Sequence, residues 1–259
     1  MSDLPKNRFK KAIGEGRQQI GLWSALSSAY TTEIIAGSGF DWLCLDAEHS
    51  PNDVLNILPQ LQAMADSPTS AMVRPPWNDM VLIKRYLDIG VQTLLIPYVQ
   101  NADEAHAAVR STRYPPAGVR GVSVVSRATE YGRVKNYMAH AASEICVIVQ
   151  VETLEALDHI EAIAAIDGVD GLFIGPSDLA ASMGYLGQPG HGEVKRLIEA
   201  TIPRIKAAGK PAGILTGDMD FAQRCIDLGS IFTAIGVDAA ILARETEKLA
   251  AKFRPVLGQ

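Results

Sequence analysis

Short apolar runs alternate with longer segments of mixed apolar and polar residues along the chain from residue 19 onward. Apolar runs of roughly four to eight residues are typical of strands buried on both faces, and longer segments with apolar residues about three to four positions apart are typical of helices. The pattern predicts strands at 19–24, 41–45, 70–73, 93–97, 145–151, 169–174, 212–215 and 232–236. It predicts helices at 29–36, 52–65, 79–90, 103–112, 154–165, 193–208, 219–228 and 239–253.

Strands that alternate with helices across short turns are typical of a (β/α)8 barrel. A doubly wound open sheet is the alternative, but the G-x-G-x-x-G fingerprint of a dinucleotide site does not follow the first predicted strand. The chain shows no internal repeat and no low-complexity linker. The sequence therefore predicts a single (β/α)8 TIM barrel domain over residues 1–259.

The segment 113–143 interrupts this alternation, because it is too long for a simple connection and contains Y-P-P-A-G-V-R-G followed by an irregular polar stretch. A long loop inside a compact barrel is often functional. We expect it to form part of the mouth of a site or part of an interface, and the sequence leaves both open.

Composition excludes several classes of protein. With 47% hydrophobic and 20% charged residues the chain can bury a substantial core. A formal net charge of -5 and the lack of a basic stripe argue against a nucleic-acid partner. No apolar run approaches the roughly 20 residues of a membrane span, and the N-terminus is charged where a signal peptide would be apolar, so no membrane partner and a cytoplasmic location are expected. Three widely spaced cysteines argue against a disulfide framework or a zinc cluster.

Three acid–base groups, Asp46, Glu48 and His49, end the second predicted strand in the stretch D-W-L-C-L-D-A-E-H at 41–49. Titratable groups at the end of a buried strand each need a partner once they are desolvated. A turn after the strand would let the Asp46 carboxylate accept a hydrogen bond from one imidazole nitrogen of His49, which would raise the basicity of the other nitrogen. The alternative is structural, with Asp46 capping the first turn of the next helix. This stretch alone leaves both open.

Further polar side chains stand at the carboxyl ends of other predicted strands, where barrels carry their chemistry. Glu152 follows the fifth strand and Asp178 follows the sixth. These two carboxylates are the candidate metal ligands, because they leave most of an octahedral shell open for a hard divalent ion. The alternatives are a helix cap for Glu152 and a turn residue for Asp178.

Arg74 follows the third predicted strand, and its planar guanidinium fits a carboxylate or enolate oxygen. The alternative role for Arg74 is a salt bridge across the barrel mouth. Trp23 and Leu215 lie at the ends of the first and seventh predicted strands and are candidates for the wall of a substrate pocket. No lysine falls inside a predicted strand, which disfavours Schiff-base chemistry.

The blocks G-F-D-W-L-C-L-D-A-E-H-S-P-N, V-R-P-P-W-N-D, V-Q-V-E-T and G-L-F-I-G-P-S-D-L, with others along nearly the whole chain, resemble the HpcH/HpaI family of metal-dependent pyruvate aldolases. The resemblance implies a barrel enzyme that reversibly cleaves 4-hydroxy-2-oxo acids to pyruvate and an aldehyde through a metal-stabilised pyruvate enolate. It implies Mg²⁺, Mn²⁺ or Co²⁺ as cofactor and a place in aromatic catabolism.

The resemblance also implies roles for the acid–base residues. His49 would be the base, directly or through a metal-bound water, with Asp46 paired to it, and Arg74 would bind the pyruvate oxygens. Asp88 would reach the histidine of a neighbouring subunit. Such aldolases are typically hexamers that exchange a C-terminal helix, here 239–253.

The remaining implied residues surround the metal and the substrate carboxylate. Glu152 and Asp178 would hold the metal, with Gln150 beside them. Backbone amides near Gly175 and Ser177 would receive the carboxylate of pyruvate.

Two other functions stay open. One is a lyase for acyl-CoA thioesters of the malyl or citramalyl type, although this chain is short for a CoA site. The other is a non-catalytic barrel that binds an acid.

Overall fold

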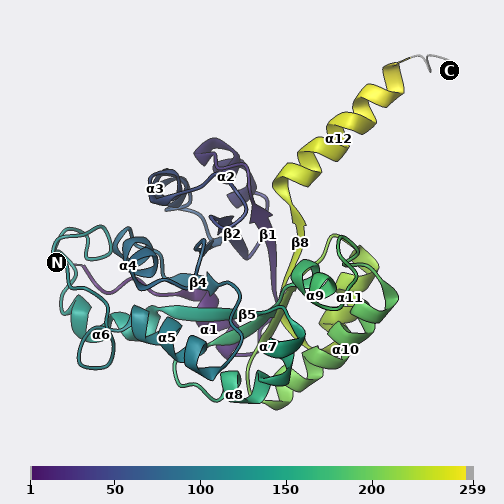
Figure 1. Cartoon of the computed structure of the whole chain (residues 1–259). Helices are drawn as coiled ribbons and strands as arrows, with labels where there is room; N and C mark the ends of the chain where they lie inside the picture. The colour runs from purple at the N-terminus through teal and green to yellow at the C-terminus, as the bar shows by residue number, and fades with distance from the viewer. Residues whose placement is uncertain (1, 255–259) are drawn as a thin grey trace.

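The computed structural model describes residues 2–254, so Met1 and 255–259 of the predicted domain lie outside the described residues. The strands form a closed parallel barrel in the order β1 to β8, which confirms the (β/α)8 prediction over the open sheet (Figure 1). The strands are β1 (Gln19–Ser24), β2 (Trp42–Asp46), β3 (Ser70–Arg74), β4 (Thr93–Ile96), β5 (Cys146–Val151), β6 (Gly171–Ile174), β7 (Ala212–Leu215) and β8 (Ser230–Val237).

Helices fill the connections between strands and surround most of the barrel (Figure 1). They are α1 (Arg8–Gly14), α2 (Ala29–Ala36), α3 (Val54–Ala63), α4 (Met80–Asp88), α5 (Ala102–Thr112), α6 (Tyr137–Glu144), α7 (Leu154–Asp158), α8 (Ile160–Ala164), α9 (Pro176–Ser182), α10 (Gly192–Ala207), α11 (Met219–Leu228) and α12 (Asp238–Phe253). Along residues 2–254, none of these helices has both the length and the apolar character that crossing a membrane requires.

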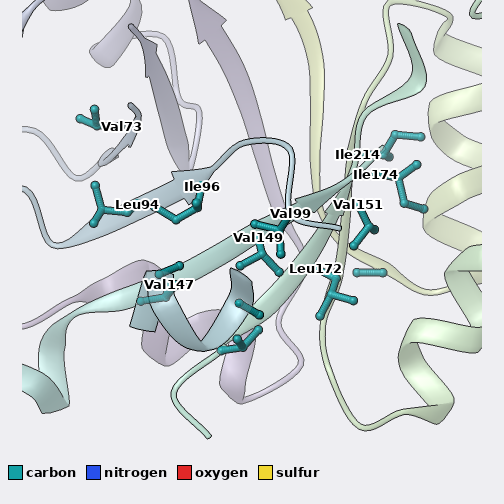
Figure 2. Close-up of a cluster of buried hydrophobic side chains, with 14 of the residues drawn as sticks. Val73, Leu94, Ile96, Val99, Val147, Val149, Val151, Leu172, Ile174 and Ile214 are labelled. Carbon is teal, nitrogen blue, oxygen red and sulfur yellow. The ribbon is translucent and has the colours of Figure 1, made fainter. Parts of the chain in front are cut away.

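Two apolar layers hold the barrel together. The outer layer lies between strands and helices and is rich in valine, leucine and isoleucine side chains, several of which are labelled in Figure 2. The inner layer fills the barrel and includes Trp42, Phe173 and Phe232. The sequence pattern did not predict α1, which adds Phe9 to this inner layer. The centre of the Phe9 ring lies 5.8 Å from that of Trp42 and 5.7 Å from that of Phe232.

Close packing inside the barrel requires glycine at two strand positions. A methyl group on Gly21 would overlap the Trp42 indole, and one on Gly213 would overlap the Phe232 ring. The large rings can therefore lie across the barrel only because β1 and β7 present no side chain there.

The predicted long segment 113–143 ends in α6, and its earlier part packs on the C-terminal end of α4. The backbone N–H of Ala128 donates to the Asp88 carbonyl (3.1 Å), and Arg127 Nη1 donates to the Ile89 carbonyl (2.7 Å). Because the segment follows α5 and precedes β5, it lies at the amino ends of the strands, beside the N-terminus in Figure 1. The segment therefore does not form the mouth of the site in its own chain, so that prediction is wrong. Its role in an interface stays a prediction.

Candidate active site

Asp46 and Arg74 form the central ion pair at the carboxyl ends of the strands. The parallel register of β2 and β3 places the two residues opposite each other. Arg74 Nε donates to Asp46 Oδ1 (2.8 Å) and Nη2 donates to Oδ2 (2.7 Å), a bidentate pair with both side chains buried. Burial alone would raise the pKa of Asp46, but the hydrogen bonds and charge of Arg74 outweigh it and lower that pKa.

The predicted side-chain pair of Asp46 and His49 does not form, and Asp46 pairs with Arg74 instead. Among the described residues, both Asp46 oxygens bind Arg74, and Oδ1 also accepts the Glu48 backbone N–H (3.0 Å). The His49 ring is largely exposed, with Nε2 3.7 Å from Glu48 Oε1. The predicted helix-cap role of Asp46 is also wrong, because Asp53 caps α3.

Three further residues contact the Arg74 guanidinium. Its Nη1 lies 2.8 Å from Glu48 Oε2 and 3.5 Å from Gln150 Oε1. Its guanidinium carbon lies 5.2 Å from the centre of the Trp23 ring, which is itself buried in the inner layer. The salt bridge that the sequence left open for Arg74 therefore exists, and Trp23 contributes an aromatic face beneath the guanidinium rather than an open pocket wall.

Glu152 is held by one side chain and one backbone amide. Gln150 Nε2 donates to its Oε2 (2.7 Å), and the Tyr98 backbone N–H donates to its Oε1 (2.9 Å). Tyr98 adopts a left-handed backbone (φ 54°), a conformation that non-glycine residues seldom take. A methyl group on Gly175 would overlap the Glu152 carboxylate, so glycine is required there. The predicted cap role of Glu152 is wrong, because Thr153 caps α7.

Sequence reasoning found Glu152 but gave Tyr98 no role and assigned none to Glu48. A backbone amide that binds a carboxylate leaves no signal in residue type, so Tyr98 could not have been found. In the sequence Glu48 lies between two predicted site residues, Asp46 and His49. Its contact with Arg74 depends on the conformation of the turn after β2, which the sequence does not display.

The site carries surplus negative charge. Burial, followed by the charges of Asp178 and Glu48, raises the pKa of Glu152 to about 7. Burial also raises the pKa of Glu48. The charges of Arg74 and His49 lower this pKa, whereas those of Asp46 and Asp178 raise it, and the net shift is upward. Asp178 lies in the first turn of α9 and is exposed. One guanidinium thus faces several carboxylates.

These residues fit a hard divalent cation. Glu152 and Asp178 offer carboxylate oxygens, and a cation between them would relieve the repulsion that raises the Glu152 pKa. Within residues 2–254, no group of three or more His, Cys, Asp or Glu side chains is placed to hold a metal ion. Two carboxylate ligands would leave coordination positions for substrate and water.

Ser177 and Leu215 line an open cleft of about 770 Å³ beside the site, between the ends of β7 and β8 and the base of α12. Arg74 and Glu152 do not line this cleft. The structure therefore brings Asp46, Arg74, Gln150 and Glu152 together and leaves Ser177 and Leu215 on a neighbouring wall.

Asp88 does not join the site within this chain. It ends α4, at the opposite end of the barrel from Arg74. Its Oδ1 accepts from Nη2 of the fully buried Arg120 (3.0 Å). A catalytic role for Asp88 would require a second copy of the chain.

Known proteins are similar to this chain in sequence and in fold. The model of the HpcH/HpaI aldolase/citrate lyase family matches residues 19–244. A pyruvate aldolase of Rhizobium etli is 61% identical over 251 residues, covering 97% of this chain and 99% of the relative. A 4-hydroxy-2-oxo-heptane-1,7-dioate aldolase of Escherichia coli is 53% identical over 249 residues, covering 96% and 95%. The crystal structure of a family protein from Burkholderia cenocepacia superposes with a TM-score of 0.92 at 38% identity, covering 96% of this chain and 100% of that one. The chain belongs to the HpcH/HpaI aldolase/citrate lyase family.

Proposed function

We propose that this chain is a divalent-metal-dependent aldolase that reversibly cleaves 4-hydroxy-2-oxo acids to pyruvate and an aldehyde. The observation that carries the proposal is the buried Arg74, clamped by Asp46 and joined through Gln150 to Glu152 at the carboxyl ends of β2, β3 and β5. The names of the relatives at 53–61% identity support the reaction class.

Glu152 and Asp178 would hold the cation, which would be Mg²⁺, Mn²⁺ or Co²⁺. When bound, the ion supplies Lewis-acid polarisation of the keto oxygen of pyruvate. Gln150 donates to Glu152 and so fixes the orientation of that carboxylate.

Arg74 would stabilise the negative charge that develops on the pyruvate oxygens as the enolate forms. Asp46 occupies the edge of the guanidinium formed by Nε and Nη2, so Nη1, now beside Glu48, is the nitrogen that would donate to the substrate. Backbone amides near Gly175 and Ser177 would receive the substrate carboxylate.

His49 would accept the proton from the methyl group of pyruvate. The carboxylate nearest its ring is Glu48, so Glu48 takes the orienting role that the sequence gave to Asp46. A negative neighbour would also stabilise the imidazolium that forms when the proton is taken up.

The active assembly would be a hexamer in which Asp88 of one subunit reaches the histidine of the next and the C-terminal helix is exchanged. α12 supports the exchange, because Asp238 is its one buried residue and its apolar side chains are exposed. The cytoplasmic location stays a prediction.

The experiment is a pyruvate-release assay on 4-hydroxy-2-oxo acids, before and after removal of divalent ions with a chelator. We expect activity that disappears on chelation and returns with Mg²⁺, Mn²⁺ or Co²⁺. Cleavage of malyl- or citramalyl-CoA instead would favour the acyl-CoA lyase, and no cleavage of either class would favour the acid-binding barrel. Full activity after exhaustive chelation would rule out the metal.

A further inference from the structure

A second cleft lies at the opposite end of the barrel from the candidate active site. It has a volume of about 600 Å³ and is bordered by the starts of β3 and β4, the N-terminal segment and the loop before α6. Leu61, Met64 and Val91 give it apolar walls. Its size is within the range of small-molecule sites, roughly 300–1,000 Å³.

Arg8, Arg127 and Arg133 line this cleft, and in the described part of the chain their hydrogen bonds go to backbone carbonyls and not to carboxylates. Arg8 Nη2 donates to the Ser67 carbonyl (3.2 Å) and Arg127 Nη1 donates to the Ile89 carbonyl (2.7 Å). Arg133 Nη1 donates to the Glu130 carbonyl (3.1 Å). Each guanidinium carries further N–H donors, so this end of the barrel offers unused positive charge.

The other charged groups of the cleft do not cancel these arginines. Lys6 is paired with Glu144 (2.8 Å), which lies outside the cleft lining. Glu130 is the one acidic residue among the lining residues, and it accepts a hydrogen bond from the Ser2 hydroxyl. The arginines therefore outnumber the carboxylate in the cleft.

The wall that carries two of the arginines has an uncommon backbone. Glu130 and Tyr131 both have positive φ (47° and 59°), although neither is glycine, and Gly132 follows at 88°. The Tyr131 N–H donates to the Ser126 carbonyl (2.8 Å), which helps to hold this turn. Non-glycine residues held in the left-handed region cluster at active sites and ligand-binding sites.

Arg127 is fixed rather than free to swing away. Its guanidinium lies against Gly90, where an added methyl group would come within 2.7 Å of Nη1. Gly90 has a φ of 96°, so the α4–β4 turn is built with no side chain where Arg127 lies.

We propose that this cleft is a binding site for a small anion with several negatively charged oxygens, of the diphosphate or polycarboxylate class. Guanidinium groups bind such oxygens in pairs of parallel hydrogen bonds, and the apolar walls would lie against the carbon skeleton of a carboxylate ligand. Within one chain the cleft lies at the opposite end of the barrel from the candidate active site, and the proposal does not depend on the aldolase activity.

The test is isothermal titration of the full-length, chelator-treated protein at low salt with inorganic pyrophosphate and, in a second arm, with tricarballylate. We expect one site per chain for at least one anion, which also identifies the ligand class. Arg127→Gln and Arg133→Gln should each weaken binding about tenfold or more, as expected for a lost charge-assisted hydrogen bond. Arg196→Gln, which removes an exposed arginine of α10, is the matched control and should bind as the parent does.

Three outcomes would overturn the proposal. The first is no binding of either anion at millimolar concentration. The second is binding that Arg74→Gln abolishes and Arg127→Gln leaves intact, because the anion would then occupy the candidate active site. The third is an Arg127→Gln variant with unchanged affinity and a changed particle mass by light scattering, because the cleft would then receive a carboxylate of a second copy.

Discussion

At the scale of single residues, the ion pair of Asp46 and Arg74 decides how the site is arranged. The two residues meet through the parallel register of β2 and β3, a long-range relation that a single sequence does not display. Spacing along the chain offered His49 or a helix cap as the partner of Asp46 and left both open, because contacts between residues a few positions apart are the ones that local reasoning can predict. The residue types of the site were thus predictable from strand ends, whereas their pairing was decided by the register and by burial.

Replacing Asp46 should destabilise the fold. Asp46→Asn removes the bidentate charged partner of the buried Arg74 and leaves it only the contact with Glu48, and breaking a buried ion pair typically costs about 3–5 kcal/mol. The folded-state pKa of Asp46 is lowered, so its contribution is complete above the unfolded pKa of about 3.9 and is lost as the pH falls through the folded value. Urea unfolding at pH 7 and at successively lower pH values should show a difference from the parent that shrinks in acid. The exposed Asp66→Asn serves as control, and equal stability of Asp46→Asn and parent at pH 7 would contradict the pairing.

Arg74→Lys should lose most of the activity even though it keeps the positive charge. Lysine cannot hold Asp46 in a bidentate pair and direct a further planar donor to the substrate. We expect kcat/KM for pyruvate release to fall by about 10²–10³, the usual effect of removing one donor to a developing oxyanion. A rate near that of the parent, in protein shown to be folded, would exclude this role for Arg74.

Glu152 should make the metal-free protein less stable as the pH rises. Its pKa is about 7 in the folded chain, above the unfolded value of about 4.3. The folded state therefore binds this proton more tightly, and the resulting stability is present below about pH 4.3 and lost as the pH rises to about 7.

Between pH 5 and pH 8 the stability of Glu152→Gln relative to the chelated parent should rise by roughly 1–3 kcal/mol, because the amide does not ionise. Urea unfolding across that range measures the difference, with the exposed Glu155→Gln as control. A difference that does not change with pH would mean that Glu152 is ionised throughout the range.

At the scale of elements, strands were predicted better than short helices. The strand boundaries differ little from prediction, because runs buried on both faces leave a clear apolar signal. α1 and α9 were missed and α6 lies within a predicted irregular segment, and the predicted helix 154–165 is divided at His159 into α7 and α8. Helices this short gain most of their stability from packing and little from their own sequence pattern. In α1 the packing contact is Phe9, whose ring lies beside that of Trp42 inside the barrel.

Gly21→Ala should destabilise the barrel by about 1–3 kcal/mol, since the new methyl group would overlap the fully buried Trp42. Gly14→Ala is the matched control, because Gly14 ends α1 with open space around its Cα. The control should be neutral or more stable by up to about 1 kcal/mol, as alanine favours a helix over glycine. Midpoints of urea unfolding measure both, and equal midpoints for the two variants would mean that β1 and Trp42 can shift without cost.

At the scale of the whole molecule, the two ends of the barrel and the terminal helix are separate regions. The acidic site lies at the carboxyl ends of the strands, and the arginine-lined cleft lies at the amino ends. α12 projects away from the barrel after Asp238, whose carboxylate accepts the Ala25 N–H (2.8 Å) and anchors the base of the helix (Figure 1). Its exposed Leu242, Leu249 and Phe253 fall on one face of the helix.

An apolar face without a partner in its own chain is stabilised when a second chain covers it, at about 25 cal/mol for each Å² of apolar surface buried. Leu242→Glu combined with Leu249→Glu should therefore reduce the particle mass measured by light scattering while the circular dichroism of the barrel is retained. Ala251→Glu adds a carboxylate on the opposite face of the same helix and should keep the mass of the parent. If the double variant also keeps the parent mass, α12 takes no part in assembly, and the exchange of this helix between subunits is wrong.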